Sequence, residues 1–130
     1  MVGIILISHS SRLAEGATEL VRQIAAGARV MPAGGTDDGR LGTSTERIAA
    51  AIAAADTGDG VLLIPDLGSS VLSALALLSD LDPQASGKHV RLADAPFVEG
   101  AVAAAVAASG GLDLTAVASA AEEARDVPRR

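Results

Sequence analysis

Apolar runs and stretches of helical period alternate along this chain. Residues 2–8 (VGIILIS) form a continuous run of β-branched residues and leucine, which is typical of a strand buried on both faces of a sheet. In the stretch that follows, apolar residues recur at helical spacing: Leu13, Ala17, Leu20, Val21 and Ile24. Charged and polar residues fall on the opposite face. The pattern predicts a buried strand that leads into an amphipathic helix, with His9 at the junction.

The same alternation continues to the end of the chain. It predicts further strands over residues 29–33, 60–64 and 89–93, and further helices over residues 43–55, 70–79, 97–109 and 114–125. Thr43 and Glu46 match a capping box at the start of the second helix. The helix over residues 97–109 carries an apolar stripe of Val98, Val102 and Val106.

Strands that alternate with helices pair in parallel through right-handed crossovers. We therefore expect an α/β fold, an open and mostly parallel sheet of about four strands covered by helices on both faces. A length of 130 residues suits one domain, here residues 1–130. Because the chain is 49% hydrophobic with Phe97 as its only aromatic residue, the core has to consist of aliphatic side chains and alanine.

Charge and composition narrow the classes of partner and ligand. A net charge of −6 opposes binding to a nucleic-acid backbone. The first apolar run is short and no basic segment precedes it, so we expect neither a signal peptide nor a membrane span and place the chain in the cytoplasm. Without cysteine, and with two histidines that have no metal-ligand spacing, we predict no bound metal.

Two polar residues follow predicted strands on the side of the sheet where open α/β folds bind ligands. His9 follows the first strand and Asp66 follows the third. If these strands are neighbours, Asp66 can accept a hydrogen bond from one ring nitrogen of His9 and leave the other nitrogen free as a nucleophile. An isolated histidine at such a junction would more simply cap the helix or fill a turn.

The residues around this pair favour an anion at the free nitrogen. Ser10 and Ser11 begin one helix, while Gly68, Ser69 and Ser70 begin another. Helix starts carry unpaired N–H groups, and with the serine hydroxyls they suit a phosphoryl group. Ordinary N-capping is the simpler role of these serines, and it is compatible with anion binding.

A serine hydrolase is a less favoured alternative. Ser8, Ser10, His9 and Asp66 supply the residue types of a catalytic triad. Neighbours in an extended strand point to opposite faces, however, so Ser8 is badly placed for activation by His9. The sequence also has no G-x-S-x-G elbow.

Residues 34–44 (GGTDDGRLGTS) nearly match a phosphate-binding P-loop. Gly34 and Gly39 have the required spacing, but Arg40 and Leu41 replace the lysine and the hydroxyl residue. The two aspartates of the segment would also face the phosphates. We interpret the segment as a loop near the crevice, in which Thr36 lines the site, and we expect no nucleotide to bind there.

Four segments carry a resemblance to a known family: GIILISHSSRLAEG, AGGTDDGRLGTS, LLIPDLGSSVLSA and VRLADAPFVEGAVAAAV. They resemble the DhaM family, the phosphotransferase subunits of PEP-dependent dihydroxyacetone kinase, whose first domain is similar to mannose-type IIA domains. The similarity extends from residue 2 to about residue 110. It implies a phosphoryl carrier that has no cofactor of its own and forms a homodimer.

The resemblance also implies roles for two residues. His9 would be phosphorylated by the phosphocarrier HPr, supplied as a separate protein, and Asp66 would support it. The phosphoryl group would pass to ADP held on the DhaL subunit, which phosphorylates dihydroxyacetone on the DhaK subunit.

Two alternatives to this function remain. Mannose-type IIA proteins of sugar transport share the chemistry but show His-Gly and Trp-Gly-Gly-Ser-Pro segments, where this chain has His9-Ser10 and LGSS at residues 67–70. That difference favours dihydroxyacetone kinase. The second alternative is a regulatory protein in which phosphorylation of His9 only switches binding to a partner.

Overall fold

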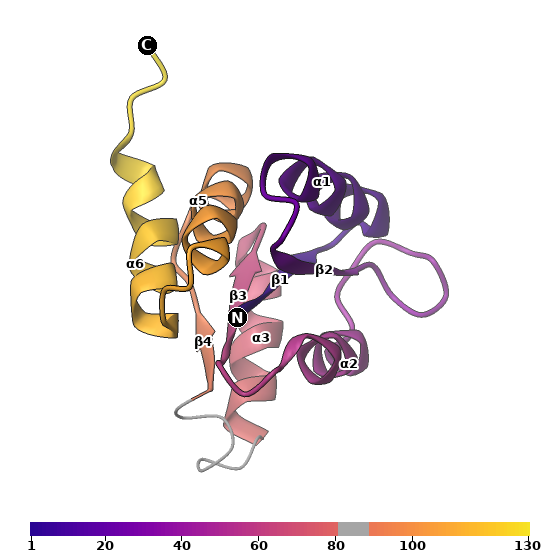
Figure 1. The fold of residues 1–130 in the computed structure, drawn as a ribbon. Coiled ribbons are helices and arrows are strands. Elements are labelled where there is room, and N and C mark those ends of the chain that lie inside the picture. The colour runs from indigo at the N-terminus through magenta and orange to yellow at the C-terminus, as the bar shows by residue number, and fades with distance from the viewer. Residues whose placement is uncertain (81–88) are drawn as a thin grey trace.

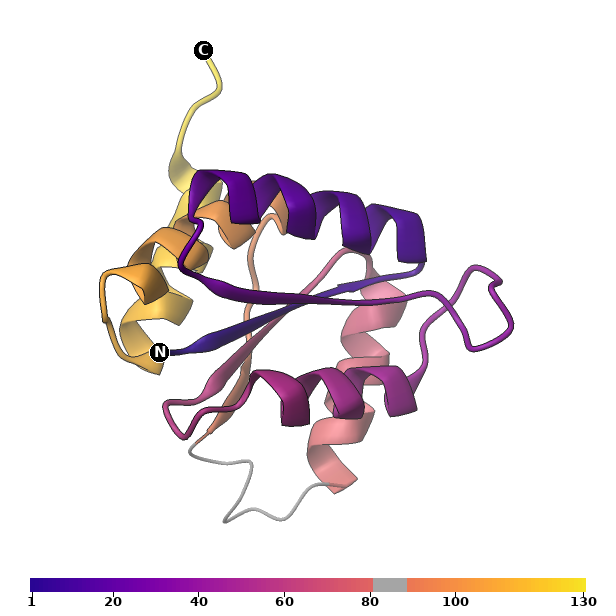
Figure 2. The same ribbon diagram turned by 45° about the vertical axis from the view of Figure 1, so that its right-hand side comes forward.

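A parallel sheet with helices on both faces forms the centre of the computed structural model, which describes residues 1–80 and 89–130 (Figures 1 and 2). Its strands are β1 (Gly3–Ser8), β2 (Arg29–Gly34), β3 (Val61–Pro65) and β4 (Val90–Leu92). They lie in the order β2-β1-β3-β4, and each pairing is parallel. The predicted fold class is confirmed. Since β2 and β3 flank β1 on opposite sides, the strand order reverses between β1 and β3.

Two layers of helices bury the two faces of this sheet. The helices are α1 (Ser11–Ile24), α2 (Thr45–Ala55), α3 (Gly68–Asp80), α5 (Phe97–Ser109) and α6 (Leu114–Glu123), with a 3₁₀ turn η1 (Ala124–Asp126) after them. Helices α1, α5 and α6 cover one face, and α2 and α3 cover the other (Figure 1). Within the described ranges, no helix has the length and apolar character that a membrane span requires.

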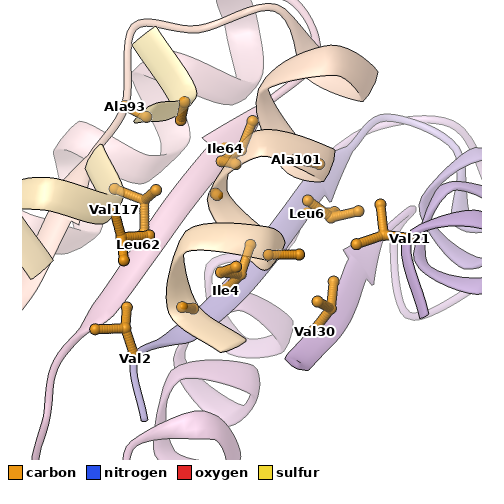
Figure 3. Packing of buried hydrophobic residues seen from close by; sticks show 14 of the residues in the cluster. Val2, Ile4, Leu6, Val21, Val30, Leu62, Ile64, Ala93, Ala101 and Val117 are labelled. Atoms are coloured by element: carbon orange, nitrogen blue, oxygen red, sulfur yellow. The ribbon is translucent and has the colours of Figure 1, made fainter. Parts of the chain in front are cut away.

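The core under α5 pairs large strand residues with small helix residues (Figure 3). The strands contribute Ile4, Leu6, Leu62 and Ile64, and Val2 just before β1 joins them. Helix α5 turns a face of alanine towards them: Ala101, Ala104, Ala105 and Ala108. The predicted valine stripe is not this buried face, since Val106 is 54% exposed. Small side chains let the helix lie close to the sheet, and the valines remain at its margins.

The buried face of α1 is also made of smaller residues than its apolar pattern predicts. Ala14, Ala17, Thr18 and Val21 are buried. Leu13, Leu20 and Ile24 are roughly half exposed. Helical spacing identified the amphipathic helix correctly but put the centre of its buried face at the wrong residues.

The capping box predicted at Thr43 is wrong. Ser44 is the N-cap of α2, and its side chain accepts a hydrogen bond of 3.2 Å from the backbone N–H of Arg47. The hydroxyl of Thr43 lies 2.5 Å from Oγ of Ser73 in α3 instead. A contact between distant segments has therefore taken the hydroxyl that the local pattern assigned to the helix.

The strand β2 lies at one edge of the sheet, and arginine side chains bond two of its carbonyl groups. The guanidinium of Arg22 donates to the carbonyl of Val30 at 2.5 Å, and that of Arg47 donates to the carbonyl of Gly34 at 3.2 Å. Pro32, midway between these two positions, has no N–H to offer. Two arginines and one proline thus occupy the positions through which another strand would pair.

Helix α1 approaches the end of β2 so closely that Gly34 has no room for a side chain. A Cβ atom there would lie 2.6 Å from the carbonyl oxygen of Ser10 and 2.8 Å from Cβ of Ala14. We expect Gly34→Ala to lower the free energy of unfolding by about 1–3 kcal/mol, because the helix has to shift. Gly16→Ala is the matched control, since a Cβ there meets nothing within 4 Å.

The control substitution should raise the free energy of unfolding by about 0.5–1 kcal/mol, because alanine favours helix over glycine. Urea denaturation of both variants measures the two changes. A Gly34→Ala variant as stable as the wild type would show that α1 does not depend on this close approach.

Candidate functional site

The candidate residues lie where β1 and β3 end side by side. The two strands pair in parallel with Ile7 opposite Pro65, so His9 and Asp66 both lie at the carboxyl ends of the strands. The backbone N–H of Asp66 donates to the carbonyl of Ile7 at 3.0 Å, which continues the pairing into the loop. The prediction that the first and third strands are neighbours is confirmed.

The side chains of His9 and Asp66 form a hydrogen bond. Nδ1 of His9 lies 3.0 Å from Oδ1 of Asp66, and the backbone N–H of His9 donates to Oδ2 at 3.2 Å. The side chain of Asp66 is only 8% exposed and that of His9 is 22% exposed. Because an ionised carboxylate only accepts hydrogen bonds, it holds the ring proton on Nδ1 and leaves Nε2 with its lone pair.

The carboxylate of Asp66 is surrounded by hydrogen-bond donors. Oδ1 lies near the backbone N–H of Leu67 (2.7 Å), the hydroxyl of Ser70 (2.9 Å) and Nδ1 of His9, while Oδ2 accepts from the hydroxyl of Ser8 at 2.8 Å. Burial raises the pKa of Asp66, but the hydrogen bonds from Ser8, Ser70, His9 and Leu67 lower it, and the balance lies below the ordinary value. The group is therefore ionised at neutral pH.

Ser8 is the member of the site that sequence reasoning missed. Its place in the sequence suggested only a nucleophile beside His9. Its side chain is fully buried and its hydroxyl bonds Asp66, while accepting a 3.0 Å hydrogen bond from the backbone N–H of Ser10. The available signal was a hydroxyl residue at the end of an otherwise apolar strand, next to the strand that carries the carboxylate.

The start of α3 contributes two serines with different roles. Ser70 is fully buried, and its hydroxyl lies between Asp66 Oδ1 and the backbone of Leu67. The hydroxyl of Ser69 contacts Nε2 of His9, the nitrogen with the free lone pair. In the described part of the chain, the N–H groups of Gly68 and Ser69 have no hydrogen-bond partner.

The start of α1 lies on the other side of His9. Ser10 is the N-cap of this helix, and its hydroxyl accepts from the N–H of Leu13 at 3.2 Å. Ser11 is the first residue of the helix and is half-buried. The predicted capping role thus belongs to Ser10. The first N–H groups of α1 point towards the carboxyl ends of the strands, where His9 lies.

The loop over residues 34–44 touches the site through its backbone. The N–H of Gly42 donates to the carbonyl of His9 at 2.9 Å. The hydroxyl of Thr36, by contrast, contacts Asp38 and accepts from the N–H of Arg40 within the loop. The structure therefore places the loop beside His9 but does not bring the Thr36 side chain to the ring.

His89 lies at the amino ends of the strands, on the opposite side of the molecule from His9. It immediately precedes β4, and its carbonyl accepts from the N–H of Val61 at the start of β3. Since all four strands run in parallel, the starts of β3 and β4 lie far from His9, which follows the end of β1. Over residues 1–80 and 89–130, no three carboxylate or imidazole side chains gather as potential metal ligands.

This arrangement equips one nitrogen for nucleophilic attack. When Nε2 bonds to an electrophile, the ring keeps its proton on Nδ1 and gains a positive charge. The Asp66 carboxylate, 3.0 Å from Nδ1, is placed to stabilise that charge. The unpaired N–H groups at the start of α3 are suited to an anionic group attached to Nε2.

Comparisons with known proteins show the family to which the chain is similar. The family model described as "PTS system fructose IIA component" matches residues 3–118. The solved structure of the "unknown function protein EF1359" superposes with a TM-score of 0.84 at 36% identity, and covers 99% of this chain and 96% of that one.

Several curated relatives carry the name DhaM. The "PEP-dependent dihydroxyacetone kinase, phosphoryl donor subunit DhaM" of Escherichia coli (strain K12) is 41% identical over 121 residues, which are 90% of this chain and 25% of that protein. The chain thus spans about a quarter of the length of this relative. The DhaM of "PEP-dependent dihydroxyacetone kinase 2" of Listeria innocua is 40% identical over 107 residues, 82% of this chain and 85% of that protein. The chain belongs to the IIA family of the phosphotransferase system and, within it, to the DhaM subunits.

Proposed function

We propose that this chain relays phosphoryl groups through Nε2 of His9, from the phosphocarrier HPr to ADP bound on a DhaL subunit. The observation that carries the proposal is the 3.0 Å hydrogen bond between Nδ1 of His9 and Oδ1 of Asp66, which leaves Nε2 as the nucleophile. Relatives named as phosphoryl donor subunits of dihydroxyacetone kinase support the choice of reaction.

In the first step, the lone pair of Nε2 attacks the phosphorus of the phosphohistidine on HPr. A bond from Nε2 to phosphorus forms, and the bond from phosphorus to the donor's imidazole breaks. The ring of His9 becomes positively charged, and the ionised Asp66 stabilises it. The hydroxyl of Ser69, which contacts Nε2 before the reaction, has to turn away and then faces a phosphoryl oxygen.

In the second step, a β-phosphate oxygen of ADP attacks the phosphorus and His9 leaves as a neutral imidazole. Between the two steps, residues at the starts of α1 and α3 hold the phosphoryl oxygens: Ser10, Ser11, Gly68 and Ser69. Ser70, also expected from the sequence to bind the phosphoryl group, is buried with its hydroxyl and N–H already bonded, so it supports Asp66 instead. The resulting ATP on DhaL phosphorylates dihydroxyacetone on DhaK. The chain works in the cytoplasm and needs no cofactor of its own.

Sugar transport is the second candidate, because the matching family model is described as a fructose IIA component. The chemistry at His9 would be the same, and the acceptor would be a sugar-specific IIB protein. Co-purification separates the two: DhaL supports the kinase, and a IIB protein supports sugar transport.

We also propose a homodimer, supported by the exposed Leu72 and Leu75 on α3, and light scattering of the purified chain tests it.

His9 is expected to be the only residue that becomes phosphorylated. Incubation with PEP, enzyme I and HPr should add the mass of one phosphoryl group to the intact chain, and His9→Gln should abolish the gain. His89 is not expected to react, since it lies at the opposite edge of the sheet. Peptide mapping that finds the modification on His89, or on the His9→Gln variant, would contradict the proposal.

Asp66→Asn is expected to slow phosphoryl transfer by roughly ten- to a thousand-fold, in line with contributions from groups that orient and charge-balance a catalytic histidine. The amide cannot stabilise the positive ring and can donate to Nδ1, which favours the wrong tautomer. Single-turnover transfer from phosphorylated HPr measures the rate. An unchanged rate would show that Asp66 only shapes the turn after β3.

The isolated chain is expected not to bind ADP, despite its glycine-rich loop. The two arginines at the loop are already paired with its carboxylates, Arg40 with Asp38 at 3.0 Å and Arg47 with Asp37 at 2.9 Å. Their charges are therefore not free to offset phosphates. Calorimetric titration with ADP and magnesium should show no heat of binding, whereas micromolar affinity would contradict the relay.

A further inference from the structure

We propose that Ser8 is a positioning residue, whose hydroxyl fixes the orientation of the Asp66 carboxylate and thereby the tautomer of His9. The inference rests on the proposed function for its effect on transfer, but its effect on the His9 ring can be measured without any transfer. Ser8 touches no reacting atom, so its role is exerted through Asp66.

The hydroxyl of Ser8 has both of its hydrogen-bonding directions occupied. It donates to Oδ2 of Asp66 at 2.8 Å and accepts from the backbone N–H of Ser10 at 3.0 Å. The side chain is fully buried at the end of the central strand, so water does not compete for these bonds. Because the Ser8 oxygen accepts from the N–H of Ser10, its own proton is left to point at the Asp66 carboxylate.

The two oxygens of Asp66 depend on different groups. Oδ1 lies near three donors, namely Leu67 N–H, the Ser70 hydroxyl and His9 Nδ1. Oδ2 has two donors, the Ser8 hydroxyl and the longer 3.2 Å contact from the backbone N–H of His9. Without the Ser8 hydroxyl, only that longer contact holds Oδ2, and the carboxylate gains freedom to rotate about its Cβ–Cγ bond.

Rotation of the carboxylate changes what Nδ1 of His9 meets. The bond that keeps the proton on Nδ1 needs Oδ1 in the plane of the ring, near the observed 3.0 Å. When that bond weakens, the proton moves more often to Nε2, and the lone pair needed for attack is lost. Loss of the hydroxyl also leaves the N–H of Ser10 without its partner at the start of α1.

The test compares Ser8→Ala with Thr18→Val. Thr18 is also buried, and among residues 1–80 and 89–130 its hydroxyl bonds only the carbonyl of Ala14 within α1. Its removal takes away a buried hydrogen bond without touching Asp66. Nitrogen-15 NMR of the His9 ring reports the tautomer in each variant. We expect Ser8→Ala to raise the fraction with the proton on Nε2, and Thr18→Val to leave that fraction as in the wild type.

Transfer rates complete the test. Single-turnover transfer from phosphorylated HPr should slow by about ten- to a hundred-fold in Ser8→Ala, the range for a lost hydrogen bond to a charged group. If Ser8 acts through Asp66, the double variant Ser8→Ala/Asp66→Asn should be no slower than Asp66→Asn alone. Independent, additive losses would overturn the inference, as would a Ser8→Ala variant with the wild-type tautomer.

The two proposals fail in different ways. If the wild-type chain gains no phosphoryl group at His9, the relay is wrong, while the NMR comparison still decides whether Ser8 sets the tautomer. If the wild type is phosphorylated and Ser8→Ala matches it in both tautomer and rate, the relay stands and the role of Ser8 is wrong.

Discussion

The structure of the site depends on keeping one carboxylate ionised in a place that water barely reaches. Asp66 is 8% exposed, and burial alone would favour its neutral form. Five donors lie within hydrogen-bond distance of its two oxygens and reverse that preference. They come from the ends of β1 and β3 and the start of α3, so Asp66 stays ionised only when these three segments are folded together.

The fold supplies these donors through its topology. Because β1 and β3 are parallel neighbours at the point where the strand order reverses, the chain turns away from the sheet after each of them. The backbone N–H groups of His9 and Leu67 then bond the Asp66 carboxylate instead of a neighbouring strand. The close approach of α1 to Gly34 keeps the helix start at the end of the strands. Packing that lies outside the site therefore determines where Ser10 and Ser11 lie relative to His9.

The fold class and the His9–Asp66 pair were predictable from the sequence. Buried parallel strands are continuous apolar runs, and a polar residue follows the first and the third of them directly. That pattern located His9 and Asp66 and placed them together. It could not assign the role of Ser8, which depends on which atom of a distant residue its hydroxyl meets. Thr43 and Leu13 were misassigned for the same reason: helical period and capping patterns describe one segment, while α3 and the sheet decide which residues are used.

The covered edge at β2 bears on how copies of this chain can associate. A fibril that grows by backbone pairing needs two available strand edges in each copy, one to join and one to extend. At β2 the carbonyls of Val30 and Gly34 already accept from arginines, and Pro32 offers no donor. Pairing of sheets through the other edge would therefore end after two molecules, so the native chain is protected against open-ended polymerisation.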